Sequence, residues 1–230
     1  MTESRPADDR SAAAEVALDP ILSRLREAIA FYLWRLEAVR VSPDEPFRLA
    51  SGNRSPIYVN CRRVISEPGF MQLWSAAALL ICEGRGLEID AIAGGETAGI
   101  PFAAYLAPTL ARPMVYVRKK AKGYGIASRV EGHLDEGSRV LLVEDLITDG
   151  GSKVGFLEAI RAAGGEVHDA LVLFDRQQGG SELLAGHGTR LHAVADRATT
   201  LAAGQAAGVL SAAASTTVEE YFADPAGWHR

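Results

Sequence analysis

The chain has 230 residues, of which 48% are hydrophobic and 23% charged, and its formal net charge is −5 from 24 basic and 29 acidic residues. This length suffices for one sizeable core but not for two full-sized domains, and the composition excludes a wholly disordered, collagen-like or coiled-coil chain. The acidic excess argues against a protein that mainly coats nucleic acid or an anionic membrane. We therefore expect one globular domain.

The two cysteines, Cys61 and Cys82, form neither a metal-binding spacing nor a disulfide framework, which favours a reducing compartment. The first ten residues lack the basic-then-apolar order of a secretory signal. The longest apolar run, near residues 76–82, is far shorter than the ~20 residues of a membrane span. The sequence thus predicts a soluble, cytoplasmic protein.

Residues 1–18 are small, polar and of mixed charge, and they predict a disordered tail. Asp19 and Pro20 then form a typical N-cap and first-turn pair, and apolar residues recur at helical spacing up to Leu36. Residues 47–50 and 57–60 are typical of short strands, and the turn-forming residues between them predict a hairpin. We call the expected helix and hairpin, residues 19–66, the hood.

Beyond the hood, predicted helices and strands alternate. The expected helices cover residues 68–83, 100–110 and 151–163. The expected strands cover residues 89–93, 114–117, 139–143, 167–174 and 192–195. Apolar strands separated by helices are typical of a mainly parallel sheet covered on both faces. We expect this α/β core to span residues 67–215, with a partly packed C-terminal segment at residues 216–230.

The strongest chemical signal is VLLVEDLITDGGS, Val140–Ser152, where an apolar strand runs into a polar turn at a helix start. Its glycines let backbone N–H groups approach an anion, its Thr and Ser hydroxyls add donors, and the helix N-terminus supplies positive potential. A phosphate cradle is therefore expected at residues 148–152. Glu144 and Asp145 come shortly before these residues, where their carboxylates could bind sugar hydroxyls or a magnesium ion. The stretch is neither a Walker loop nor a GxGxxG fingerprint.

A second signal is VRKKAKGYG, Val117–Gly125, a basic interval with two glycines and no apolar periodicity. A lone run of charges is normally a solvated turn. Near a phosphate cradle, however, a cationic loop with glycine hinges suits closure over an anionic leaving group. The length of the interval also favours a lid.

Together with Phe47–Asn60, Ile92–Ala103 and Leu173–Gly180, these two stretches resemble the orotate phosphoribosyltransferases over roughly residues 40–200. The most discriminating pieces are SG-x-x-SP-x-Y in the predicted hairpin, the RK-x-x-K loop, and DRQ after a strand. The Val140–Ser152 stretch alone is shared with purine and uracil salvage enzymes and with regulators. The resemblance implies a type I phosphoribosyltransferase-like α/β fold, a mainly parallel sheet flanked by helices, with the hood at its N-terminal end.

The resemblance implies Mg²⁺-dependent transfer of phosphoribose from PRPP to N1 of orotate, giving orotidine 5′-monophosphate and pyrophosphate in pyrimidine synthesis. The Mg²⁺ ion would be held mainly by PRPP, and no dedicated protein ligand is assigned. It also implies a homodimer whose Arg118–Gly125 loops reach across to the partner's site, and no nucleic-acid or membrane partner. Two alternatives stay open: a phosphoribosyltransferase for another base, and a non-catalytic PRPP-sensing regulator with the same fold.

Roles follow from the resemblance residue by residue. The catalytic residues are expected to be Lys122, Glu144 and Asp145. PRPP binding is expected from Arg118, Lys119, Lys122, Tyr124, Glu144, Asp145, Leu146, Ile147, Thr148, Asp149, Gly150, Gly151 and Ser152. The pyrophosphate loop is expected to be Gly95, Glu96, Thr97 and Ala98. Orotate is expected to contact Tyr58, Val59, Thr148 and Arg176, the last through paired hydrogen bonds to its carboxylate.

Some residues depart from the common pattern of this family. Tyr124 stands where many members have histidine, and Ala50 and Ala98 stand where lysines are common. Asp149 lies inside the expected cradle, where a small or hydroxyl residue is usual. Because its charge would repel a phosphate, we expect the Asp149 side chain to turn away into solvent and its replacement to have little effect.

Overall fold

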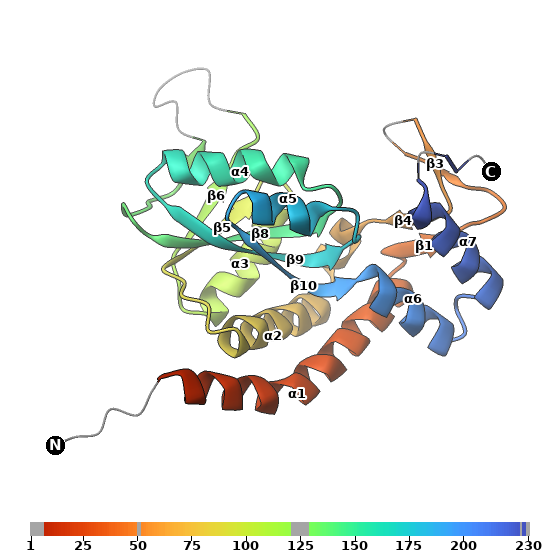
Figure 1. Ribbon diagram of the computed structural model, residues 1–230, viewed down its shortest axis with the longest axis horizontal. Helices are drawn as coiled ribbons and strands as arrows, with labels where there is room; N and C mark the ends of the chain where they lie inside the picture. Colours follow the sequence, from red (N-terminus) through yellow and green to blue (C-terminus); the bar gives the residue numbers. More distant parts are fainter. Residues whose placement is uncertain (1–6, 50–51, 121–128, 226, 229–230) are drawn as a thin grey trace.

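A six-stranded sheet forms the centre of the protein (Figure 1). The computed structural model describes residues 7–49, 52–120, 129–225 and 227–228, with side chains from residue 19 onward. The strands of the sheet are β5 (Ala91–Gly95), β6 (Met114–Val117), β7 (Val130–Glu131), β8 (Arg139–Ile147), β9 (Glu166–Asp175) and β10 (Arg190–Asp196). Their order is β10-β9-β8-β5-β6-β7, and only the β6–β7 pair is antiparallel. The predicted mainly parallel α/β core is confirmed.

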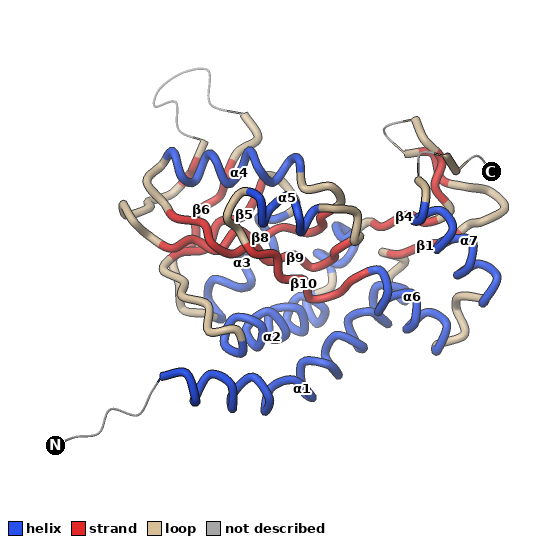
Figure 2. Tube along the Cα trace, in the orientation of Figure 1, coloured by secondary structure: helices blue, strands red, loops and turns tan. Residues whose placement is uncertain are grey.

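Helices cover both faces of this sheet, as Figure 2 shows with the strands forming one layer between them. One face carries α1 (Ala7–Arg35), α2 (Pro68–Gly84) and α3 (Gly99–Thr109). The other face carries α4 (Gly151–Ala162) and α5 (Gly180–Gly186). The last two helices, α6 (Arg197–Ala206) and α7 (Ala212–Ala223), follow the edge strand β10 (Figure 1).

The apolar strands explain why both faces need a cover. Side chains alternate across a strand, so Leu141 and Val143 of β8 enter the core under α2 and α3. Val140 and Leu142 enter the second core, under α4. Neither face of β8 can be left to water, because each presents buried aliphatic side chains. No helix in the described part of the chain is long and apolar enough to cross a membrane.

The predicted hairpin is wrong in its pairing. The small N-terminal elements are β1 (Val39–Val41), β2 (Phe47–Arg48), β3 (Arg54–Ser55), β4 (Ile57–Val59) and the 3₁₀ helix η1 (Cys61–Ser66). β2 pairs with β3, whereas β4 pairs with β1, which the sequence did not predict. Pro56 lacks an N–H group, and the Ser55 hydroxyl bonds locally with the backbone of Ile57, so the extended segment breaks there into two strands.

Both ends of the chain also differ from the prediction. α1 begins at Ala7 rather than at Asp19, so residues 7–18 are helical instead of disordered. The alanine-rich sequence before Asp19 is strongly helix-forming, and the helix continues through Pro20 despite the lost backbone donor. At the other end, α7 crosses the predicted boundary between residues 215 and 216, and its Val218 and Tyr221 are buried.

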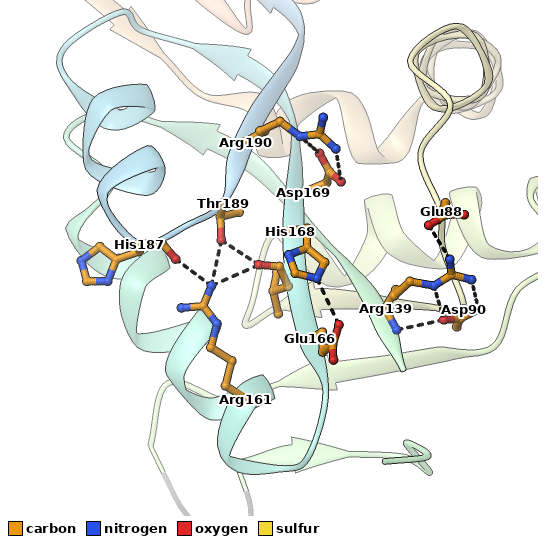
Figure 3. A network of polar contacts seen from close by, with 11 residues as sticks. Glu88, Asp90, Arg139, Arg161, Glu166, His168, Asp169, His187, Thr189 and Arg190 are labelled. Atoms are coloured by element: carbon orange, nitrogen blue, oxygen red, sulfur yellow. Dashed lines mark hydrogen bonds and ion pairs between the residues drawn. The ribbon is translucent and has the colours of Figure 1, made fainter. Parts of the chain in front are cut away.

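Ion pairs gather toward the amino ends of the strands (Figure 3). Arg139, the first residue of β8, pairs with Glu88 and Asp90, each at 2.7 Å. Its hydrogen bonds hold the pKa of Asp90 well below the usual carboxyl range. Arg190, the first residue of β10, similarly bonds both carboxylate oxygens of Asp169 on β9. These pairs tie neighbouring strands together at the end opposite to the predicted site.

Candidate functional site

The predicted site residues converge where the strand order reverses. From β5 the chain moves outward to β6 and β7, then returns to β8 on the other side of β5. In open parallel sheets, ligands bind outside the carboxyl ends of the strands at such a switch point. A cavity of about 250 Å³ lies there, which we call the crevice. Its lining includes Glu96, Thr97 and Ala98 after β5, Lys119 after β6, and residues 144–152 other than Ile147 and Gly151.

Glu144 lies at the floor of the crevice and is almost fully buried. Its exposed fraction is 4%, and its carboxylate forms an ion pair with the buried ammonium of Lys153. Burial raises the pKa of Glu144, and the charge of Lys153 opposes that rise. A Cβ on either Gly95 or Gly99 would collide with the Glu144 carboxylate, so these two positions must be glycine for the acid to lie there.

Asp145 is the more accessible of the two adjacent acids. It lines the crevice and is half-buried. Burial raises its pKa, while the positive charges of Lys153 and Arg62 act in the opposite direction. A carboxylate that lines a polar cavity near two cations can accept hydrogen bonds from ligand hydroxyls. Glu144, already paired, mainly holds Lys153 in place.

The predicted cradle lies at the N-terminus of α4. Gly150 is the N-cap residue and has a φ of 84°, a left-handed conformation that glycine adopts without strain. The first amides of a helix have no partner within the helix, and together with the helix dipole they attract anions. Thr148 and Ser152 line the crevice beside them. Ile147 is buried in the core instead, so only its backbone faces this turn.

Asp149 does not simply turn away from the cradle. Its side chain is exposed, but its Oδ1 accepts a hydrogen bond from the Gly151 amide at 3.1 Å. Gly151 is one of the amides that a phosphate in the cradle would use. The carboxylate therefore places negative charge on the cradle itself, which corrects the expectation that it points only into solvent.

Replacing Asp149 by Asn should consequently tighten phosphate binding. Asn keeps an acceptor for Gly151 and removes the like charge, so we expect PRPP affinity to rise about three- to tenfold, measured by titration at low ionic strength. Glu158→Gln on the exposed side of α4 makes the same change in net charge and should leave affinity within twofold. Equal gains in both variants would show a general effect of net charge.

The basic interval contributes one described cation to the crevice. Lys119 lines it, and the Lys119 amide donates to the Glu96 carboxylate at 2.7 Å, which joins the basic interval to the loop after β5. Arg118 lies outside the lining and pairs with Glu131 at 3.5 Å. Lys122 and Tyr124, both predicted to bind PRPP, lie outside the described residues.

Of the predicted orotate residues, Thr148 lines the crevice, whereas Tyr58, Val59 and Arg176 are not in its lining. Tyr58 and Val59 are half-buried on β4, which leads directly into η1 and its crevice residue Arg62. Arg176 follows β9, and its amide donates to the carbonyl of Ile147 in β8 at 3.1 Å. Both segments thus adjoin elements that line the crevice.

Sequence reasoning missed Lys153, Phe156 and Arg62, all of which line the crevice. Lys153 directly follows the predicted cradle, and a lysine in the first turn of a helix is an unusual choice, because the helix dipole repels it there. This unusual position could have identified Lys153 as a candidate site residue. Arg62 and Phe156 carry no comparable signal. Among the described residues, no group of three or more His, Cys, Asp or Glu side chains is arranged to hold a metal ion.

Comparisons with known proteins agree on one family. The profile of the phosphoribosyl transferase domain matches residues 68–187. An orotate phosphoribosyltransferase of Jannaschia sp. (strain CCS1) is 45% identical over 215 residues, covering 91% of this chain and 93% of that protein.

Solved structures give the same result. The orotate phosphoribosyltransferase of Aeropyrum pernix superposes with a TM-score of 0.67 at 39% identity, covering 76% of this chain and 96% of its own. A Mycobacterium tuberculosis orotate phosphoribosyltransferase solved in complex with PRPP superposes with a TM-score of 0.63 at 26% identity, covering 76% and 98%.

Proposed function

This chain belongs to the orotate phosphoribosyltransferases, type I phosphoribosyltransferases of pyrimidine biosynthesis, and on that premise we propose how its crevice transfers phosphoribose from PRPP to orotate. The observation that carries the assignment is the convergence of an accessible acid, Asp145, and the α4 N-terminus in one cavity at the switch point. The products are orotidine 5′-monophosphate and pyrophosphate.

We assign PRPP to the crevice in two parts. Residues 148–152 bind the 5′-phosphate through backbone amides and hydroxyls, because the helix N-terminus there attracts anions. Asp145 accepts hydrogen bonds from the ribose hydroxyls, with Glu144 and Lys153 forming the floor beneath. This placement leaves C1 of the ribose directed toward β4 and Arg176, where the base is expected.

The leaving pyrophosphate belongs near Glu96, Thr97 and Lys119. The bond from C1 to the pyrophosphate oxygen breaks as the sugar becomes cationic. N1 of orotate forms the new bond to C1 and gives up its proton to the departing pyrophosphate. Lys119, and by family resemblance Lys122, stabilise the charge that collects on the departing oxygen. Mg²⁺ bound with PRPP supplies further positive charge there. The donor set fits an ion carried mainly by the substrate. Of the carboxylates that line the crevice, Glu144 pairs with Lys153, Glu96 accepts the Lys119 amide and Asp149 accepts the Gly151 amide, which leaves Asp145 as the most available one.

The base subsite is assigned to Tyr58, Val59 and Arg176. A guanidinium binds a planar carboxylate through two parallel hydrogen bonds, and orotate carries such a group beside its ring. Tyr58 lies in an aromatic cluster with Phe47, their ring centroids 5.6 Å apart. The Arg40 guanidinium lies within 5.5 Å of both rings. This packing supports a firm wall for a pyrimidine ring.

The direct test is consumption of orotate on addition of PRPP and Mg²⁺, with adenine, hypoxanthine and uracil as competing acceptors. We expect orotate to be the only one of these four bases that is converted. Preferential use of another base would make this chain a phosphoribosyltransferase of different specificity. PRPP binding without turnover of any base would support the regulator instead.

The buried free thiols of Cys61 and Cys82 support the proposed cytoplasmic location, where disulfides are rare.

We also propose a homodimer in which the Arg118–Gly125 loop of one subunit acts at the partner's site. The support for this proposal is the family resemblance. Residues 121–128 of the loop lie outside the described residues. A twofold dimer of this kind has two composite sites. Lys122→Ala and Asp145→Asn should each be nearly inactive alone and should recover activity when mixed.

The expected recovery follows from counting sites in the mixed dimer. One site carries both defects and the other carries neither, so each heterodimer should approach half of the wild-type rate. Native mass spectrometry measures the fraction of heterodimers. Confirmed exchange of subunits without recovered activity would show that the loop acts within its own subunit.

A further inference from the structure

Arg176 has an unusual environment for an arginine. It is half-buried, and its Nε atom is buried without a hydrogen-bond partner among the described residues. The neighbouring Asp175 does not neutralise it, because the Asp175 carboxylate accepts the Gln177 amide at 2.7 Å. No described carboxylate forms an ion pair with Arg176. A guanidinium held in this state is available to an anionic ligand.

The C-terminal helix α7 supplies the contacts that hold this guanidinium. The Phe222 ring lies 5.7 Å from Cζ of Arg176 and 4.3 Å from Cζ of Arg197. Tyr221 packs against the same Phe222 ring, with ring centroids 5.2 Å apart. Burial lowers the pKa of Arg176, and the interaction with Tyr221 opposes that change. The guanidinium therefore lies by the Phe222 ring, and Tyr221 supports that ring and acts on the charge of Arg176.

Tyr221 is itself firmly held. Its exposed fraction is 3%, and its ring packs edge-on against Phe222 at 5.2 Å and against Trp228 at 5.5 Å. Trp228 returns to α7 after a turn in which Asp224 accepts the Gly227 amide at 2.9 Å. We call Tyr221, Phe222 and Trp228 the α7 aromatic cluster. Such a cluster has few rotamers, so it presents the Tyr221 hydroxyl at a defined position.

This cluster lies beyond the general phosphoribosyl transferase domain, whose profile ends at residue 187. In Figure 1, α7 occupies the same end of the molecule as β1 and β4, and Tyr58 belongs to β4. The chain thus brings its last helix to the end of the crevice where the base is assigned. Nothing in the PRPP-binding part of the site requires this helix.

We propose that Tyr221 and Phe222 are positioning residues that orient Arg176 toward the carboxylate of orotate and thereby set base specificity. This proposal rests on the assignment of Arg176 to orotate. An arginine side chain has several freely rotating bonds, and fixing them costs binding free energy when the ligand must do it. With the α7 aromatic cluster in place, the guanidinium fork is already ordered before orotate arrives.

The test is a double-mutant cycle in the full-length enzyme. Tyr221→Phe removes the hydroxyl and keeps the ring, so the KM for orotate should rise about five- to tenfold. The kcat and the KM for PRPP should stay within twofold. In an Arg176→Lys background the same Tyr221→Phe change should alter the KM for orotate by less than about twofold, because the group it orients is gone.

Two further variants complete the experiment. Phe222→Leu, which keeps an apolar side chain but removes the aromatic face, should also raise the KM for orotate selectively. Tyr105→Phe, on α3 with a partly exposed side chain, is the matched control and should change nothing. The melting temperature of each variant shows whether α7 stays folded.

An unchanged KM for orotate in Tyr221→Phe would overturn the proposal. Equal rises for orotate and PRPP would also overturn it, as would the same rise in the Arg176→Lys background, because Tyr221 would then act by another route. If Arg176→Ala itself leaves the KM for orotate unchanged, the assignment of Arg176 fails and this proposal fails with it. Wild-type enzyme that does not turn over orotate would instead contradict the proposed function.

Discussion

Arg176→Ala is expected to raise the KM for orotate strongly while PRPP affinity stays nearly intact. Removing one partner of a buried, charged hydrogen-bonded pair costs about 2–5 kcal/mol, which corresponds to a loss of roughly 30- to 5,000-fold. The Cζ atom of Arg176 already lies against the aromatic ring of Phe222, so the guanidinium has little need to reorganise when orotate binds. Steady-state kinetics with each substrate varied in turn measure the effect.

The matched control is Arg190→Ala. Arg190 is also an arginine at the end of a core strand, but it bonds Asp169 at the amino end of β10, away from the crevice (Figure 3). Its loss should leave the KM for orotate within about twofold, since it touches no assigned substrate group. Comparable losses for orotate and PRPP in Arg176→Ala would contradict the assignment of Arg176 to the base.

Lys153→Met is expected to destabilise the protein by about 3–5 kcal/mol at neutral pH, because it leaves the Glu144 carboxylate buried and unpaired. The same variant should lose most of its PRPP affinity, since Lys153 lies beside Asp145 in the crevice. Urea unfolding and PRPP titration measure the two effects separately.

The pH dependence of this variant has a definite sign. Burial raises the pKa of Glu144, and the charge of Lys153 opposes that rise, so removing Lys153 raises this pKa further. A group whose pKa is higher in the folded state stabilises the fold fully below its unfolded pKa, and this stability is lost as the pH rises through the folded pKa. Lys153→Met should therefore be more stable near pH 5 than near pH 8.

A double variant separates charge from packing in this pair. Glu144→Gln combined with Lys153→Met has no buried charge and nearly the same volume, so most of the lost stability should return. Its unfolding free energy should also lose the pH dependence of the single variant. If the single variant is as stable as the wild type at pH 8, the buried ion pair does not hold the floor of the crevice.

The sequence alone was sufficient wherever the signal is local. The strands Met114–Val117 and Arg139–Val143 could be predicted because their runs of apolar residues need burial on both faces of a sheet. The cradle at residues 148–152 could be predicted for a similar reason, since its glycines, hydroxyls and helix start are consecutive in the chain. In each case, the residues that define the element are neighbours in the sequence.

Only the tertiary structure decided what distant segments do to each other. β4 pairs with β1 rather than with the strand before it, and no local propensity distinguishes these partners. Glu144 loses its contact with water because Gly95 and Gly99 lie against it, and this burial is what makes Lys153 its necessary partner. Arg176 lies by the Phe222 ring across 46 residues of chain. Burial, pairing and the positions of long side chains depend on contacts that only folding creates, and these features therefore could not be determined from the residues alone.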